Sequence, residues 1–217
     1  MINLRVLDQN GQGSDSLVID AINQAIALKN AYNIRVINIS LGRPIYESYT
    51  QDPLCQAVEA AWKAGIVVVV AAGNDGRDNS FGTNGYGTIN APANDPYVIT
   101  VGSMKTMGTP DRSDDLIATY SAKGPTQVDQ VVKPDIVAPG NQIVSLLASP
   151  SDTLPATYSQ DLVPLTYYMQ TGHGNSSQYY MLSGTSMATP VVSGAVLSKA
   201  RIYLLALRVS SGTTAFQ

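Results

Sequence analysis

The sequence predicts an α/β fold, a three-layer sandwich in which helices flank a mostly parallel central sheet. Strand-like and helix-like segments alternate over residues 4–72, an order typical of parallel sheets built from strand–helix–strand units. The run from Ile66 to Ala72 is apolar at every position, as in a strand that helices bury on both faces. With 217 residues, of which 44% are apolar, the chain is long enough to bury such a core.

Composition narrows the classes of function. Charged residues make up 13% of the chain, the formal net charge is −3 and no Lys/Arg cluster is present, so nucleic acid is not an expected partner. The longest apolar run, from Gly65 to Gly73, is too short to cross a membrane, so no membrane partner is expected. Met1 leads directly into a strand-like pattern, so we expect no signal peptide in this form, and the sequence assigns no location.

The single cysteine, Cys55, excludes an intrachain disulfide. It follows Asp52 and Pro53, a pair typical of a helix N-cap and a first helical residue. We expect the thiol to be a small buried group on this helix, because no base lies nearby in the sequence to activate it.

The first two expected strands enclose a helix. Leu4–Leu7 has the pattern of a short buried strand, and Val36–Ser40 has that of a second. Between them a polar, glycine-bearing loop precedes a helix that Ser14 or Asp15 can cap. The predicted buried face of this helix comprises Val18, Ile22, Ala25 and Ile26.

A second helix, expected over Asp52–Lys63, ends at Gly65 and leads into the third strand, Ile66–Ala72. Its predicted buried face comprises Leu54, Val58, Ala61 and Trp62. Because strands and helices alternate here, we expect the three strands to be parallel neighbours in one sheet.

The rest of the chain is expected to contain more loop. Strands are predicted at Tyr97–Gly102 and Gln142–Leu147, and its prolines make Lys133–Gly140 an edge or irregular strand. Asp111–Asp115 is expected to be a solvated turn, because its carboxylate spacing matches no calcium loop. The polar, tyrosine-bearing segment 149–181 is expected to hold an irregular pair of short strands.

Three short motifs stand beside these elements. Ser40-Leu41-Gly42 and Ala71-Ala72-Gly73-Asn74 each follow a strand, and Ser183-Gly184-Thr185-Ser186 precedes a helix-like run. Gly184 permits a sharp turn, and Ser186 then lies at a helix start, where unpaired N–H groups favour negative charge. We expect Pro190 to be tolerated there because first-turn N–H groups lack helical partners.

These motifs, in this order, resemble those of the subtilisin-like serine peptidases, the subtilase or peptidase S8 family, from about Asn3 to Leu197. The resemblance implies that Ser186 is the nucleophile of a serine hydrolase and that the Asn74 amide is the oxyanion donor. It also implies a cis peptide bond near Pro92. Structural calcium is compatible with the resemblance, but no ligand loop is seen, so no cofactor is expected. The implied substrate-binding residues are Ser40, Leu41, Gly42, Ala71, Ala72 and Gly73.

The resemblance begins partway into the family domain. We therefore expect residues 1–217 to form a single partial domain without the segments that bear the catalytic Asp and His, and with a weakly matching tail at 201–217. The only histidine, His173, lies in a polar segment and is expected to be an exposed loop residue rather than a substitute base. Since a serine hydroxyl needs a base, peptidase activity is expected to be impaired, with slow hydrolysis of small esters.

Two further expectations follow from the missing segments. In the resembled fold the absent strand lies between those matched by Leu4–Leu7 and Val36–Ser40, so its loss either leaves a gap or forces these two strands to pair directly. An open apolar sheet edge invites another chain, which predicts a homo-oligomer. The alternative to a hydrolase of peptides or small esters is a non-catalytic subtilase module that binds peptide or merely folds. Beyond Leu197 the pattern fades, and a continued helix over Arg201–Leu207 is expected to lead into a frayed tail.

Overall fold

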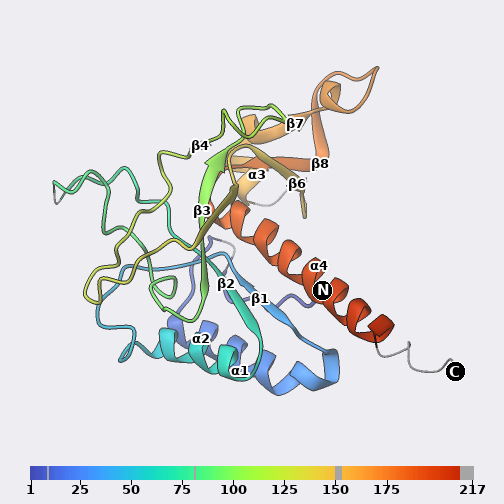
Figure 1. Ribbon diagram of the computed structural model, residues 1–217. Helices are drawn as coiled ribbons and strands as arrows, with labels where there is room; N and C mark the ends of the chain where they lie inside the picture. Colours follow the sequence, from blue (N-terminus) through green and yellow to red (C-terminus); the bar gives the residue numbers. More distant parts are fainter. Residues whose placement is uncertain (9, 81, 150–152, 211–217) are drawn as a thin grey trace, which may run out of the picture.

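The computed structural model describes residues 1–8, 10–80, 82–149 and 153–210, with the backbone alone for 200–210. It is an α/β structure in which helices cover both faces of a mostly parallel sheet, as the sequence predicts (Figure 1). Four strands run parallel in the order β1-β2-β3-β5, and the two-residue β4 pairs antiparallel with β3. The strands are β1 (Val36–Ile39), β2 (Val67–Ala71), β3 (Ile99–Lys105), β4 (Leu116–Ile117) and β5 (Ile136–Pro139).

Two helices, α1 (Asp15–Tyr32) and α2 (Pro53–Lys63), cover one face of the sheet. Ser14 caps α1, and the Asp52 carboxylate caps α2 by accepting a hydrogen bond from the Leu54 N–H at 2.9 Å. The buried residues of both helices follow the predicted spacing, with one exception. Trp62 is 46% exposed and lies against the ring of Tyr97, so its assignment to the buried face of α2 is wrong.

The opposite face is covered by α4 (Thr185–Ser210), which contacts β1, β2, β3 and β5. The side chains of β2 pack alternately against the two helix layers, α1 and α2 on one face and α4 on the other. Val68 and Val70 pack into the cluster beneath α1 and α2, whereas Val69 packs with Ala188 and Val192 of α4. Each fully buried valine contributes roughly 1.5–3 kcal/mol, so an apolar residue is favoured at every position of this strand.

The N-terminal segment differs from the prediction. Leu4–Leu7 forms no strand, and Leu4 is exposed, while Val6 packs partly against the core. Strand β1 pairs with β2 on one side, and its other edge has no strand partner in the described part of the chain. A strand forms only where a neighbouring ladder satisfies its backbone groups, and residues 4–7 have no such neighbour in the ranges that the structure describes.

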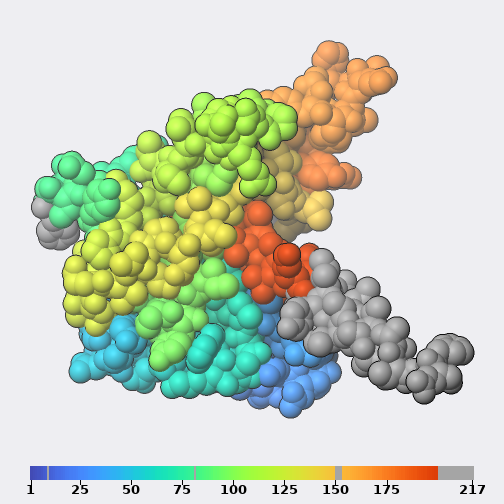
Figure 2. All heavy atoms as spheres, in the orientation of Figure 1, coloured from blue at the N-terminus to red at the C-terminus, as the bar shows by residue number. Residues whose placement is uncertain are grey.

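A second, antiparallel sheet precedes α4 and stands out from the body of the molecule (Figures 1 and 2). Its order is β6-β8-β7, so the predicted pair of short strands in segment 149–181 is present, although β8 is longer than expected. The sheet comprises β6 (Ile143–Leu146), β7 (Leu162–Pro164) and β8 (Asn175–Leu182), with the short helices α3 (Thr153–Thr157), η1 (Ser159–Asp161) and η2 (Leu165–Tyr167) between them.

Two further predictions concern the chain ends and the loops. The backbone of α4 continues through the expected Arg201–Leu207 to Ser210, while the rest of the expected frayed tail, from residue 211 on, lies outside the described residues. The Ala91–Pro92 peptide bond is cis, as the resemblance implies, and the neighbouring Ala91 pairs with Arg43 in an isolated bridge. No helix in the described ranges is both long and apolar enough to span a membrane.

Candidate active site

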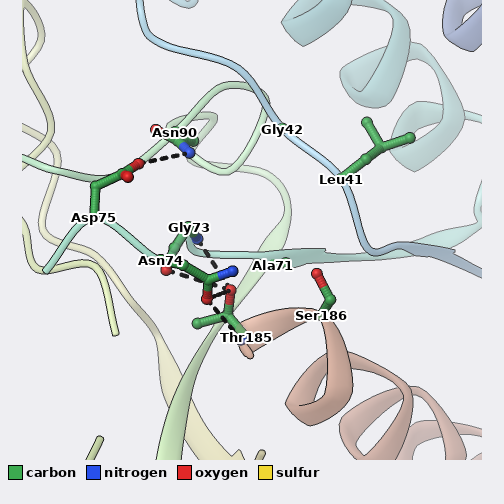
Figure 3. A pocket seen from close by; sticks show the side chains of 9 residues that line it. All are labelled: Leu41, Gly42, Ala71, Gly73, Asn74, Asp75, Asn90, Thr185 and Ser186. Atoms are coloured by element: carbon green, nitrogen blue, oxygen red, sulfur yellow. Dashed lines mark hydrogen bonds between the residues drawn. The ribbon is translucent and has the colours of Figure 1, made fainter. Parts of the chain in front are cut away.

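Ser186 is the second residue of α4 and lies at the end of the central sheet where β2 terminates (Figure 3). The turn before it is fixed by its backbone: the Gly184 N–H donates to the Gly140 carbonyl at 2.8 Å, and the Met187 N–H donates to the Gly184 carbonyl at 3.0 Å. The hydroxyl therefore stands at a helix N-terminus, where unpaired N–H groups and the helix dipole favour developing negative charge.

The side chain of Asn74 faces this turn in a fixed orientation. Its Oδ1 accepts hydrogen bonds from the Thr185 N–H at 2.9 Å and from Thr185 Oγ1 at 3.1 Å. Because both donors require the amide oxygen, Nδ2 must point the other way, and Figure 3 shows it on the side of Ser186. In the part of the chain that the structure describes, Nδ2 has no acceptor, so it is a free, preoriented donor.

A reciprocal pair of hydrogen bonds joins Ser186 to the end of β1. Ser186 Oγ donates to the Ser40 carbonyl at 3.2 Å, and Ser40 Oγ donates to the Ser186 carbonyl at 2.9 Å. The second bond has a cause within α4, where Pro190 is the sixth residue rather than part of the first turn. Pro190 has no N–H to donate to the carbonyl four residues earlier, so the Ser40 hydroxyl satisfies that carbonyl instead.

We expect Ser40→Ala to lower the free energy of unfolding by about 1–2 kcal/mol, because it leaves the partly buried Ser186 carbonyl without a donor. In a Pro190→Ala background the new N–H can donate to that carbonyl, so the same substitution should cost much less. Urea unfolding of the four members of this double-mutant cycle measures the difference. Equal costs of Ser40→Ala in both backgrounds would contradict this explanation of the Ser40 contact.

Ser186 and Asn74 line one pocket of about 230 Å³ at the end of the sheet (Figure 3). Of the substrate-binding residues implied by the resemblance, Leu41, Gly42, Ala71 and Gly73 line it. Ala72 does not, because its side chain is wholly buried in the core beneath α1 and α2.

Ser40 lines an adjoining hollow of about 430 Å³, which shares Leu41 and Gly42 with the first pocket. Arg43 anchors the loop that contains Leu41 and Gly42 and borders both cavities. Its guanidinium donates to the buried Asp52 carboxylate at 2.8 Å and to Asp15 at 2.7 Å. Hydrogen bonding to these two carboxylates raises the pKa of Arg43 despite the opposing effect of burial, so the guanidinium remains charged and the loop remains tied to α1 and α2.

Within the described residues the structure brings no imidazole to the serine, and the Asp75 carboxylate in the pocket accepts a hydrogen bond from Asn90. The nine residues that line the pocket include no histidine, and His173 is an exposed residue of the connection between β7 and β8. In Figure 1 this connection projects away from the start of α4. Cys55 does not offer an alternative nucleophile, because burial raises the pKa of its thiol, which donates to Asn94 Oδ1.

No cluster of three or more His, Cys, Asp or Glu side chains suited to a metal occurs in the described ranges. The predicted solvated turn at 111–115 uses its carboxylates locally. Asp111 accepts from the Ser113 N–H, and Asp114 accepts from Thr109 Oγ1. These contacts make the segment a self-bonded exposed loop.

Three residues of the site were not predicted from the sequence. Thr185, which orients Asn74, could have been suspected because it precedes the serine. Asp75 and Asn90 also line the pocket, and Asn90 Nδ2 donates to Asp75 Oδ2 at 3.3 Å. No sequence pattern signals Asn90, because only the fold brings residues 73–75 and 90 together.

Comparisons with known proteins match most of the chain to one family. The family model described as "Subtilase family" matches residues 1–201. The chain is 38% identical over 200 residues to serine protease AprX of Bacillus subtilis (strain 168), covering 89% of this chain and 40% of AprX. It is 34% identical over 199 residues to subtilisin E of the same organism, covering 90% of this chain and 38% of that protein.

The similarity extends to solved structures. The chain superposes on Sphericase with a TM-score of 0.59 and 27% identity, over 88% of this chain and 50% of that one. It thus spans half or less of the length of these relatives. Motifs, fold and family match together show that the chain belongs to the subtilase family of serine peptidases.

Proposed function

We propose that this chain acts as a subtilisin-type serine hydrolase in which Ser186 is the nucleophile and Asn74 is the oxyanion donor. The observation that carries the proposal is that a helix-start hydroxyl and a preoriented amide line one pocket although they are 112 positions apart in sequence (186 − 74). A neutral donor that is already fixed needs no reorganisation as negative charge develops on a carbonyl oxygen.

The reaction follows from these positions. Ser186 Oγ adds to the carbonyl carbon of a peptide or ester, and the carbonyl electron pair moves to an oxyanion beside Asn74 Nδ2. Collapse of this intermediate breaks the bond to the leaving group and forms an acyl-serine. The Oγ proton passes to water, because no histidine lines the pocket and the Asp75 carboxylate is hydrogen-bonded to Asn90. Water then cleaves the acyl-serine, releasing the acid and restoring the hydroxyl.

The lack of a histidine in the pocket limits the substrates that this chain can use on its own. An amide leaving group must be protonated, whereas an activated ester leaves as a stable anion. In subtilisin, removal of the triad still leaves roughly 10³–10⁴-fold acceleration over water, from binding and the oxyanion site. We therefore propose slow turnover of small activated esters and much slower cleavage of peptides.

A fluorophosphonate probe tests the nucleophile. We expect phosphonylation at Ser186, identified by mass spectrometry of the modified peptide, and loss of both labelling and p-nitrophenyl ester turnover in Ser186→Ala. Ser198→Ala is the matched control, because Ser198 is an exposed serine of the same helix. Ester turnover that is unchanged in Ser186→Ala refutes the proposal. Peptide binding without labelling would favour the alternative, a non-catalytic module.

The unpaired edge of β1 supports a further part of the proposal, a homodimer formed by pairing of this edge with a second copy. An open strand edge presents unpaired N–H and C=O groups to another chain. Light scattering at micromolar concentration should therefore give twice the 23.0 kDa chain mass. A monomer across that concentration range would rule the dimer out.

A further inference from the structure

Tyr120 contacts both segments of the candidate active site, although it does not line the pocket. Its carbonyl accepts the Gly76 N–H at 3.0 Å, in the loop that carries the proposed oxyanion donor. Its hydroxyl donates to the Gly140 carbonyl at 3.0 Å, and the same carbonyl accepts the Gly184 N–H at 2.8 Å, in the turn that precedes the proposed nucleophile. This half-buried residue therefore connects the two segments at a point outside the pocket.

The connection from Tyr120 to the oxyanion loop runs through the backbone. The Ala122 N–H donates to the Gly73 carbonyl at 3.0 Å, a second hydrogen bond between the same two segments. A Cβ built on Gly76 would lie 3.1 Å from the carbonyl carbon of Tyr120, so the two backbones are in close contact. The loop that carries Asn74 is therefore held by main-chain groups, which a substitution of the tyrosine side chain leaves in place.

The connection to the nucleophile turn runs through the tyrosine hydroxyl. Ser103 Oγ, on a fully buried residue of β3, lies 2.9 Å from this hydroxyl. Because the single hydroxyl proton of Tyr120 goes to the Gly140 carbonyl, Ser103 Oγ must be the donor of the bond between the two hydroxyls. Each bond of such a chain polarises the next, which strengthens the one to Gly140.

Gly140 is packed closely against both neighbours. A Cβ built on it would overlap Ser103 Oγ and would lie 2.7 Å from the Gly184 carbonyl oxygen and 3.0 Å from Ala188 Cβ. Its carbonyl oxygen has two lone pairs, which the Tyr120 hydroxyl and the Gly184 N–H use. The position of the Gly184 turn is therefore set by a carbonyl that the tyrosine holds.

Two separate contacts thus join the nucleophile turn to the oxyanion loop. At the pocket, the Thr185 N–H donates to Asn74 Oδ1 at 2.9 Å. Outside the pocket, Gly184 is linked to the same loop through Gly140 and Tyr120. A single contact allows the turn to rotate about it, whereas a second contact at a different point removes this freedom. Loss of the tyrosine hydroxyl leaves the contact at the pocket without this second constraint.

From this arrangement we propose that Tyr120 is a positioning residue, whose hydroxyl fixes the orientation of Ser186 relative to Asn74. The inference rests on the proposed function, since it concerns the alignment of the nucleophile with the oxyanion donor. Attack on a carbonyl needs both groups in place at once, so a misaligned Ser186 lowers kcat while substrate binding is retained. For the loss of one neutral hydrogen bond we expect a roughly 3- to 10-fold fall in kcat.

The first test removes only the hydroxyl, in Tyr120→Phe. We expect kcat for p-nitrophenyl esters to fall roughly 3- to 10-fold with KM unchanged. Tyr168→Phe is the matched control, because Tyr168 also donates one hydroxyl hydrogen bond, to Ser176 Oγ at 2.7 Å, and does not line the pocket. This control should keep the wild-type values of both constants.

A double variant separates positioning from stability. Tyr120→Phe leaves the buried Ser103 hydroxyl without its acceptor, which by itself lowers the free energy of unfolding. Tyr120→Phe/Ser103→Ala removes this unpaired hydroxyl, so it should be more stable in urea than Tyr120→Phe while its kcat stays low. Recovery of kcat together with stability would show that the tyrosine is merely structural and would overturn the inference.

Hydrogen exchange of the Gly184 amide requires no turnover and separates this inference from the proposed function. In Tyr120→Phe we expect this amide to exchange roughly 2- to 10-fold faster, measured by NMR, while the amides of α1 keep their wild-type rates. Faster exchange in a protein that turns over no ester counts against the hydrolase and supports the positioning of the turn. Unchanged exchange at Gly184, or a kcat of Tyr120→Phe within twofold of an active wild type, overturns the inference even if Ser186 is labelled by the fluorophosphonate.

Discussion

Replacing Asn74 by aspartate is expected to lower kcat for p-nitrophenyl esters by roughly 10²–10³, the loss found for removal of one oxyanion donor, measured in this same family. The change is isosteric. One oxygen of the new carboxylate can still accept the hydrogen bonds from Thr185, but the Nδ2 donor becomes a negatively charged oxygen that repels the oxyanion. In a site without a histidine, the oxyanion donor provides much of the remaining acceleration, so initial rates should fall close to those of Ser186→Ala.

The matched control for Asn74→Asp is the same substitution at an asparagine outside the pocket. Asn79→Asp repeats the same chemical change at an exposed turn, where Asn79 Oδ1 also accepts a backbone N–H, that of Asn84, at 2.7 Å. Both variants should keep the wild-type midpoint of urea unfolding to within the small effects typical of surface changes. Turnover by Asn74→Asp within twofold of wild type would mean that the amide does not stabilise the oxyanion.

The elements that the sequence predicts correctly are those whose signal is local. Ser14 and Asp52 begin their helices where the capping chemistry indicates, and the uninterrupted apolar run of β2 indicates a strand buried on both faces. Leu4–Leu7 also has an apolar, strand-like pattern but forms no strand, because strand formation depends on a partner that no local pattern reveals.

Prediction of the candidate site from the sequence has the same limit, because only local motifs can be recognised. Motif order could identify Ser186 and Asn74 as a pair, since each motif is a contiguous stretch. The hydrogen bond from Ser40 to the carbonyl of Ser186 spans 146 positions, and the interaction of Thr185 with Asn74 spans 111. Such contacts exist only after the strands are in register, so a single sequence carries no periodic signal for them.

The second large expected effect concerns a buried polar pair near α2, Asn94 and Asp95. Asp95 is fully buried; its Oδ1 accepts the Tyr97 N–H at 2.8 Å, while Oδ2 has no partner among the described residues. Nδ2 of the adjacent Asn94 is also buried and has no acceptor in the described part of the chain. Burial raises the pKa of Asp95 to about 6; the charge of Glu59 adds to the rise, while the Tyr97 N–H and the charges of Lys133 and Lys63 oppose it.

This raised pKa makes stability fall as pH increases. The folded protein holds the Asp95 proton up to about pH 6, whereas the unfolded chain releases it near the ordinary pKa of 3.8, so between these values the folded state binds more protons. The free energy of unfolding should therefore decrease through this window and lose about 3 kcal/mol in all from this group. Other carboxylates act in the opposite direction: hydrogen bonds lower the pKa of Asp78 and of Asp111. The contribution of Asp95 to the pH dependence of the free energy of unfolding is therefore measured with a variant that lacks its carboxyl group.

Asp95→Asn keeps the acceptor for the Tyr97 N–H and stays neutral at every pH, so it should equal wild type near pH 4 and exceed it by about 2–3 kcal/mol above pH 7. Urea unfolding at unit steps between pH 4 and pH 8 measures this difference, and Asp20→Asn, at an exposed position of α1, controls for the change in net charge. A difference that stays constant across this range would show that the carboxyl is already charged in the folded protein at pH 4. The unpaired Oδ2 argues against that outcome, because a buried carboxylate oxygen without a donor makes the neutral form the more stable one.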